Sequence, residues 1–192
     1  IDRSRGLGDV YKRQELTSGT LDVTKRDVTF EGSRVYDGTI DANTANFTAT
    51  FSNLVSGESI NLTGSGVVSS KNVASGQSIT LGSITLANGN AAASNYNLTA
   101  ATLNISKRPL GLAGTKVYDS SSTASASDLT TVSNLVGSET ISLTGNGVMI
   151  NSNVGDSKPI TNISGLSLGD GLNGGLASNY TLSGATQTMS VT

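Results

Sequence analysis

The stretch that decides the fold is Thr20-Leu21-Asp22-Val23-Thr24-Lys25-Arg26, because it returns 82 positions later as Thr102-Leu103-Asn104-Ile105-Ser106-Lys107-Arg108. In both copies apolar and polar residues alternate, which places every second side chain on one face of an extended strand. A Lys-Arg pair follows each strand directly. The chain therefore contains an internal repeat that is built on half-buried β-strands.

Further matches along the chain keep nearly the same spacing. Val35-Tyr36-Asp37 returns as Val117-Tyr118-Asp119, and Ser94-Asn95-Tyr96 returns as Ser178-Asn179-Tyr180. The offsets drift by a few residues, as expected when loops vary in length and strands do not. These matches indicate two homologous units of about 82 residues each. A unit of that length is a domain, because one coil of a solenoid typically has about 20–50 residues.

We place the two units at residues 15–106 and 107–192. Residues 1–14 contain Asp9-Val10-Tyr11-Lys12-Arg13-Gln14, a run similar to a translated transposon-end sequencing adapter. We expect this segment to be such an adapter or a disordered tail. The segment Thr188–Thr192 resembles the one that leads from the first unit into the second, so we expect a third unit to follow in the full protein.

The dominant period within each unit is two. Alternating pairs such as Ile60 and Leu62, or Ile141 and Leu143, indicate half-buried strands, and glycines between them indicate turns. No apolar stripe of helical period occurs. We predict an all-β chain of two tandem immunoglobulin-like β-sandwich repeats, elongated, with β-grasp-like units as the alternative. Lys107 follows a strand directly, so we expect a link of only a few residues.

Composition excludes several function classes. The chain has no Cys, His or Trp, which removes disulfides, thiol nucleophiles, His-based triads and the usual zinc ligands. Charged residues make up 14%, with 12 basic against 14 acidic and no basic cluster, so we expect no nucleic-acid partner. No window approaches the roughly 18 uninterrupted apolar residues of a membrane span. We expect no cofactor.

Two motifs carry a resemblance to a known family. Val35-Tyr36-Asp37-Gly38 and Asn95-Tyr96-Asn97-Leu98 resemble the YDG-type repeats of filamentous-haemagglutinin-like bacterial surface adhesins, which are exported by two-partner secretion. The resemblance covers nearly all of residues 20–192. It implies a repeat of an exported surface fibre, and it transfers no catalytic residue to this chain.

We assign structural roles to the residues of the repeated motifs, which are Tyr36, Asp37, Gly38, Asn95, Tyr96, Tyr118, Asp119, Asn179 and Tyr180. In each Tyr-Asp pair we expect the ring to fill the core, its hydroxyl to find a backbone partner and the Asp to cap a turn. The alternative for these tyrosines is stacking against a sugar from a loop. The second unit departs from the motifs in two places, with Ser120 for Gly38 and Ser152 for Lys71.

The carboxylates Asp37, Glu58, Asp119 and Glu139 are the candidates for acid–base chemistry. Glycosidase chemistry requires two carboxyl groups about 5–10 Å apart in a cleft. Glu58 and Glu139 stand instead in Gly/Ser-rich turn sequences, where solvated acids are common, so we expect no enzyme and no catalytic residue. The Asp-x-Asp-x-Asp spacing of calcium loops is absent, and we assign no metal ligands. A calcium site assembled from loops stays open.

These observations favour a structural function. We expect a spacer or stalk repeat of a large secreted adhesin at the bacterial cell surface, whose partners are the neighbouring repeats of the same chain. The alternative is an adhesive module that binds host glycans or proteins through the loops Asn88–Ser94 and Asp170–Ser178, which differ most between the units. A degradative enzyme ranks last, because the reactive residue types are absent or scattered.

Overall fold

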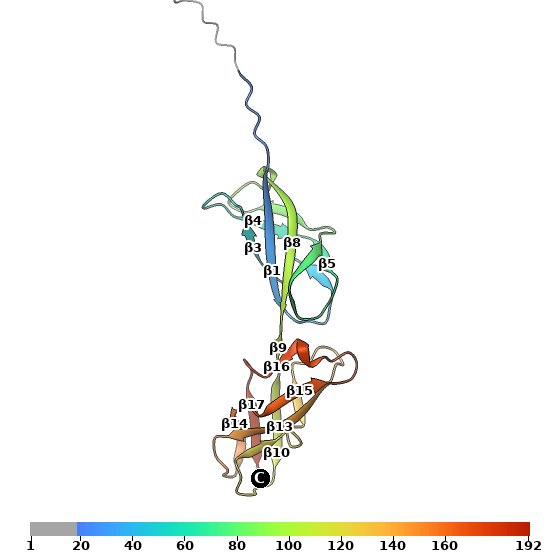
Figure 1. The fold of residues 1–192 in the computed structure, drawn as a ribbon. Coiled ribbons are helices and arrows are strands. Elements are labelled where there is room, and N and C mark those ends of the chain that lie inside the picture. Colours follow the sequence, from blue (N-terminus) through green and yellow to red (C-terminus); the bar gives the residue numbers. More distant parts are fainter. Residues whose placement is uncertain (1–18) are drawn as a thin grey trace, which may run out of the picture.

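The structure is a computed structural model that describes residues 19–192. The expected adapter or tail at residues 1–14 lies outside the described residues. Residues 19–192 are nearly all β, with 52% strand and 3% helix, in two curled sheet units. This confirms the prediction of two tandem β-rich repeats. The units stack end to end along one axis (Figure 1).

The first unit contains eight strands and one short 3-10 turn. They are β1 (Arg26–Val35), β2 (Asp41–Asn43), β3 (Thr48–Ser52), β4 (Ile60–Thr63), β5 (Ser65–Val68), β6 (Ala74–Thr80), β7 (Thr85–Asn88), η1 (Ala93–Asn95) and β8 (Tyr96–Ser106). Six of these strands form a sheet in the order β2-β5-β6-β8-β1-β3, and β4 pairs with β7 as a separate ribbon.

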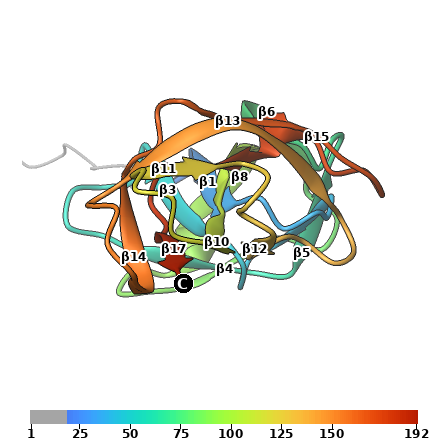
Figure 2. The ribbon, with the colours of Figure 1, turned by 90° about the horizontal axis from the view of Figure 1, so that it is seen from below.

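The second unit repeats this order. Its elements are β9 (Arg108–Pro109), β10 (Gly111–Lys116), β11 (Thr123–Ser125), β12 (Thr131–Ser133), β13 (Ile141–Met149), β14 (Gly155–Asn162), β15 (Leu166–Asp170), η2 (Ala177–Asn179), β16 (Tyr180–Thr181) and β17 (Gln187–Val191). The sheet order is β11-β13-β14-β17-β10-β12, with β15 on β13 and a short β16-β9 pair. Seen end-on, β13 arches over β10 and β17, so the sheet curls around the core (Figure 2).

The first and last long strands of each unit pair in parallel at the centre of the sheet. β1 and β8 run side by side from the pair Arg26–Tyr96 to the pair Val35–Ser106, and β10 pairs with β17 in the same sense. The other strand pairs of the two main sheets are antiparallel. The chain therefore enters each unit at one end and leaves it at the opposite end.

The two units are joined by one residue. Lys107 alone separates β8 from β9, and β10 follows after Leu110. One extended run of chain thus passes from the centre of the first sheet to the centre of the second (Figure 1). The short link expected from the sequence is a single residue.

Apolar side chains of the central strands form the core. Alternation along β8 buries Ala101, Leu103 and Ile105, and β17 buries Met189 and Val191 in the same way. These residues belong to one apolar cluster with members from both units. Full burial of a side chain of this size contributes about 1.5–3 kcal/mol.

One predicted strand is absent from the described structure. Leu21 and Val23 alternate with polar residues like Leu103 and Ile105, yet they are 89% and 88% exposed and lie in no strand. Alternation shows which face of a strand is apolar, but a strand forms only when a neighbour accepts its hydrogen bonds. Within residues 19–192 no strand pairs with this segment. The prediction of a half-buried strand here is therefore wrong.

Candidate functional site: the junction between the two units

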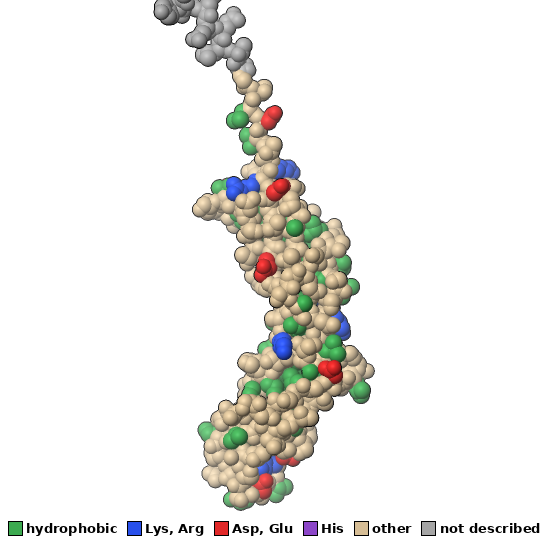
Figure 3. Space-filling view, viewed as in Figure 1, with side chains coloured by type: hydrophobic (Ala, Val, Ile, Leu, Met, Phe, Trp, Pro, Cys, Tyr) green, Lys and Arg blue, Asp and Glu red, His purple; other side chains and the backbone are tan. Residues whose placement is uncertain are grey.

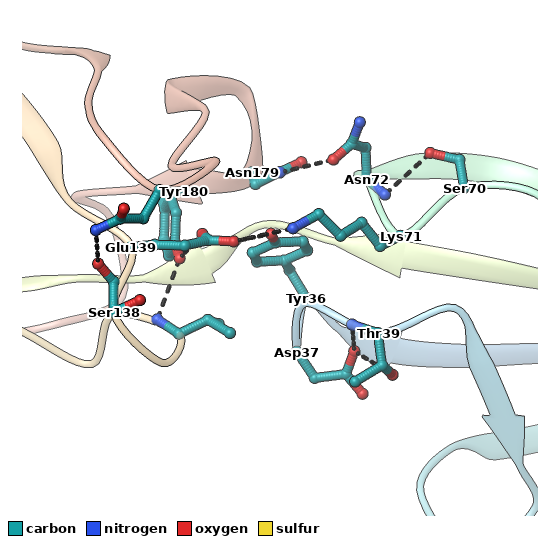
Figure 4. Close-up of polar contacts among 12 residues, drawn as sticks. Tyr36, Asp37, Thr39, Ser70, Lys71, Asn72, Ser138, Glu139, Asn179 and Tyr180 are labelled. Carbon is teal, nitrogen blue, oxygen red and sulfur yellow. Dashed lines mark hydrogen bonds and ion pairs between the residues drawn. The ribbon is translucent and has the colours of Figure 1, made fainter.

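A buried carboxylate of the second unit joins tyrosines of both units. Tyr36 directly follows β1, Glu139 lies in the loop between β12 and β13, and Tyr180 begins β16. The Tyr36 hydroxyl donates a hydrogen bond of 2.7 Å to Glu139 Oε1, and the Tyr180 hydroxyl donates one of 2.6 Å to Oε2 (Figure 4). The two rings meet edge to face, with centroids 5.5 Å apart. Both oxygens of the carboxylate are thus held.

A cation of the first unit completes this cluster. Lys71, in the turn between β5 and β6, places its Nζ 3.2 Å from Glu139 Oε1 (Figure 4). Glu139 is 7% exposed, and Tyr36 is fully buried. A buried charge is tolerated only where it is paired and hydrogen-bonded, and these three donors meet that requirement.

The environment shifts the pKa values of all three acidic groups. Burial alone would raise the pKa of Glu139, but hydrogen bonds from Tyr180, Tyr36 and Lys71 outweigh it and hold that pKa below its ordinary value. Burial, reinforced by the hydrogen bond to Glu139, raises the pKa of Tyr36 to about 12 and that of Tyr180 to about 12. The arrangement therefore keeps the carboxylate charged and both phenols neutral at ordinary pH.

A second contact between the units is made by an asparagine. Asn179 ends η2 and is fully buried. Its Nδ2 donates to Asn72 Oδ1 at 3.0 Å, and its Oδ1 accepts the backbone N–H of Val73 at 3.0 Å. The side chain thus binds the β5–β6 turn of the first unit by both ends of its amide. Figure 4 shows the contact with Asn72.

Two further contacts line the junction. Arg108 donates through Nε and Nη2 to the backbone and side-chain oxygens of Asn134, both at 2.7 Å, and through Nη1 to the backbone oxygen of Tyr36 at 3.3 Å. Val136 packs against Gly38, where an added Cβ would lie 2.6 Å from the nearest valine methyl. The junction therefore combines polar pairing with close packing.

The turn after Tyr36 has the same form in both units. Asp37 Oδ1 accepts the backbone N–H of Thr39 at 3.0 Å, and Asp119 Oδ1 accepts that of Ser121 at 2.9 Å. Gly38 has φ +78°, and Ser120 at the matched position has φ +61°. Both residues therefore adopt the left-handed backbone that glycine favours. The aspartate caps the turn that follows each tyrosine.

The structure corrects two expectations about the tyrosines. The Tyr36 hydroxyl was expected to find a backbone partner, but it binds the carboxylate of Glu139 in the other unit. The Tyr118 ring was expected to fill the core, but it is 53% exposed. The reason is that Tyr36 is covered by the following unit, whereas nothing within the described residues covers Tyr118. One sequence signal could have identified Glu139 as the acceptor of the Tyr36 hydroxyl: a glutamate recurs at the matched positions Glu58 and Glu139 of the two units.

At the far end of the first unit the matching residues are only partly assembled. The Tyr96 hydroxyl donates to Glu58 and accepts the backbone N–H of Val55, as Tyr180 does with Glu139 and Val136. The hydrogen bond to Glu58, with burial, raises the pKa of Tyr96. Asn95, the counterpart of Asn179, is exposed.

The other acidic candidates do not gather into a metal site within the described residues. No cluster of three or more Asp or Glu side chains that could hold a metal ion occurs within residues 19–192. The loop Asp170–Ser178 leads into η2, and the Asp170 carboxylate at its start accepts the Ala177 N–H at 2.8 Å. Of the two candidate binding loops, Asp170–Ser178 lines part of a groove of about 570 Å³ through Ala177 and Ser178. Asn88–Ser94 lines part of a groove of about 380 Å³ through Ala93 and Ser94. A further groove of about 450 Å³, between β1, β3 and β8, is lined by neither loop.

Two surface properties follow from the described chain. The face in Figure 3 carries few charged side chains, which are scattered and form no basic patch. None of the helices in residues 19–192 has the length and apolarity that crossing a membrane requires.

The tyrosines, the glutamate and the asparagine gathered at the junction recur along the sequence, whereas Lys71 is matched by Ser152. The YDG domain matches twice, over residues 19–103 and 99–189. The chain belongs to the YDG domain family. Tyr36 of the first YDG unit lies against Glu139 and Tyr180 of the second. Comparison with curated proteins and with solved structures gave no match.

Proposed function

We propose that this pair of YDG units is a structural spacer in a large secreted surface adhesin of bacteria, of the filamentous-haemagglutinin-like type. The observation that carries the proposal is the junction, in which the buried carboxylate of Glu139 is held by Tyr36 and Lys71 of one unit and by Tyr180 of the other. A spacer must transmit orientation from one unit to the next. A linker without such contacts would not.

The path of the chain supports the same function. β8 has 11 residues, and a strand of that length spans about 36 Å. Because its end leads through Lys107 directly into the central strands of the next unit, each added unit extends the axis instead of folding back. Length then grows with the number of units and requires no new type of contact.

Bending at the junction would break the contacts that the buried carboxylate of Glu139 and the buried amide of Asn179 make across it. If the units separated, Lys71 and the Tyr36 hydroxyl would leave Glu139, and Asn72 and Val73 would lose Asn179. Hydrogen bonds to charged groups contribute about 1.5–3 kcal/mol each. We therefore expect one dominant angle between the two units.

The composition and the repeated motifs support export to the cell surface. A chain without Cys has no thiols that could cross-link during export, and the Tyr-Asp-Gly and Asn-Tyr-x-Leu motifs resemble those of exported adhesins. The loop Asp170–Ser178 supports a spacer over a loop-based adhesive module, because it presents Asn179 to the other unit.

The test measures the distance distribution between the units. Because the chain has no Cys, single spin labels can be attached at Thr50→Cys on β3 and Thr131→Cys on β12, which are exposed and match in the two units. Double electron–electron resonance should give one narrow distribution. Glu139→Ala should broaden it, and Glu58→Ala, the matched change at the end of the first unit away from the junction, should not.

The proposal would fail on either of two results. A broad distribution in the unchanged chain would show that the units move independently. A narrow distribution that Glu139→Ala leaves unaltered would show that the carboxylate cluster does not set the angle between them.

A further inference from the structure

The end of the first unit that lies away from the junction presents the same groups that the second unit uses at the junction. Glu58 is exposed and, among the described residues, its side chain accepts only the Tyr96 hydroxyl, whereas Glu139 also accepts Tyr36 and Lys71. Its second carboxylate oxygen thus occupies the position that receives a tyrosine in the junction.

An arginine at this end matches as well. Arg26 donates through Nε and Nη2 to Asn53 at 2.7 and 2.8 Å, as Arg108 does to Asn134. Arg108 uses its remaining nitrogen, Nη1, for the backbone oxygen of Tyr36 at 3.3 Å. The Nη1 of Arg26 donates to no group of the described chain. We call Arg26, Glu58 and Asn95 the head surface.

The opposite end of the chain carries the other half of the junction. The backbone N–H of Tyr118 donates to Thr192 at 2.8 Å, as that of Tyr36 donates to Ser106 at 2.9 Å, so both tyrosines stand at the same place beside the last strand. Yet Tyr118 is half exposed, whereas Tyr36 is fully buried.

A valine near Tyr118 shows the same contrast. Val154 is 65% exposed, whereas its counterpart Val73 is partly buried and donates its N–H to Asn179. We call Tyr118, Asn153 and Val154 the tail surface. Two apolar side chains are thus exposed where their counterparts lie beneath a following unit.

An independent observation comes from the segment before β1. Thr20–Thr24 matches Thr102–Ser106, the end of the last strand of a unit, yet its two apolar side chains are almost fully exposed. The counterparts Leu103 and Ile105 are buried in a sheet. This segment has the sequence of a last strand, and the described residues contain no sheet for it to join.

We propose that the head and tail surfaces are docking surfaces for another YDG unit, and that a second copy of this chain placed head to tail occupies them. The Tyr118 hydroxyl of one copy donates to Glu58 of the next, Arg26 donates to the backbone oxygen of Tyr118, and Asn95 accepts the N–H of Val154. This goes beyond a spacer of two units, because it assigns a partner to the head surface and to the tail surface and names the contacts that hold it.

Two differences make this contact weaker than the junction within the chain. Ser152 stands where Lys71 supplies an ion pair, so the carboxylate of Glu58 receives no cation from the tail surface. Ser120 carries a Cβ where Gly38 packs against Val136, so Val55, the matching valine, has to shift. We therefore expect docking when the copies are covalently linked, which raises their effective concentration, and not between free chains in dilute solution.

The test joins two copies of residues 25–192, so that Lys25 of the second copy follows Thr192 of the first. This reproduces the order of Ser106 and Lys107 within the chain. Spin labels are placed at Thr131→Cys of the first copy and Thr50→Cys of the second. The expected distribution has the same mean distance as the Thr50–Thr131 pair of the single chain and is similarly narrow.

Substitutions in one copy at a time supply matched controls. Glu58→Ala in the second copy should broaden the distribution across the new contact, and so should Tyr118→Phe in the first. Glu58→Ala in the first copy, where the head surface is free, should leave it unchanged. Any loss of folding that the substitution causes is the same in both copies, so only docking distinguishes them.

The results separate this inference from the spacer proposal. A broad distribution across the new contact, with a narrow one inside each copy, would overturn the docking surfaces and leave the spacer standing. Equal effects of Glu58→Ala in either copy would overturn them too. Broad distributions at both places would overturn both proposals.

Discussion

The hydroxyl of Tyr36 in the first YDG unit donates a 2.7 Å hydrogen bond to the carboxylate of Glu139 in the second, 103 positions further along the chain. No part of this contact is local. It exists because β1 and β8 end at the same side of their sheet and because β8 continues into the next unit after one residue. The stability of the junction should therefore depend on residues that lie far apart in the sequence.

Glu139→Ala should destabilise the protein by about 2–4 kcal/mol, since two buried tyrosine hydroxyls lose a charged acceptor and one cation loses its partner. Urea unfolding followed by circular dichroism measures the change in the free energy of unfolding. Glu58→Ala, at the matched exposed position, should cost clearly less. Equal losses in the two variants would contradict a special role for the buried carboxylate.

Stability should fall at high pH because of the two tyrosines at the junction. Tyr36 and Tyr180 have pKa values of about 12 in the folded protein, against 10.0 ordinarily, so the folded state holds these protons more tightly. Their contribution is fully present below pH 10.0 and is lost as the pH rises through about 12.

Thermal unfolding of the unchanged chain and of Tyr36→Phe across this pH range isolates the effect from other titrating groups. The difference in stability between the two proteins should shrink above pH 10.0. A difference that stays constant up to pH 12 would mean that the hydroxyl titrates alike in the folded and unfolded chain.

Asn179→Ala should expose the β5–β6 turn to exchange. The amide of Val73 loses its acceptor and Asn72 loses its donor, at a cost of about 1–3 kcal/mol for buried groups left unpaired. Hydrogen exchange measured by NMR should show faster exchange of the Val73 amide. Asn95→Ala, at the exposed matching position, is the control and should leave this amide as slow as before.

The parallel central pair should resist pulling along the axis. Force applied between Thr24→Cys and Lys107→Cys acts along β1 and β8 in opposite directions, so it loads all their hydrogen bonds together. Force applied between Thr24→Cys and Ser94→Cys starts at one end of the pair and separates it bond by bond. Single-molecule pulling should give a severalfold higher unfolding force in the first geometry. Similar forces would show that this pair does not bear the load.

Much of the architecture could be predicted from short-range patterns. Alternation identified Leu103 and Ile105 as core residues, and the recurrence of Tyr-Asp and Asn-Tyr identified two equal units. Alternation shows which face of a strand is apolar but not which strand lies beside it. Alternation therefore could not predict that β1 pairs in parallel with β8. Nor could it predict that Leu21 and Val23 lie in no strand.

The candidate site was only half predicted, since its residues were named but their partners were not. Glu139 was interpreted as a solvated acid in a turn, an interpretation that suits Glu58 in a nearly identical sequence. The two differ because one faces a neighbouring unit and the other does not. Local sequence cannot distinguish them, because the burial that changes a carboxylate from solvated to paired comes from groups about 70 to 100 positions away.

The sequence by itself determined that the chain is all β, that it consists of two YDG units and that their motif residues recur in order. Only the tertiary structure decided that Tyr36 is buried and Tyr118 exposed, although both stand in a Val-Tyr-Asp sequence. The physical reason is that strand formation follows from local alternation, whereas burial and charge pairing depend on what packs against a surface. At the end of a repeat, that partner is the next repeat.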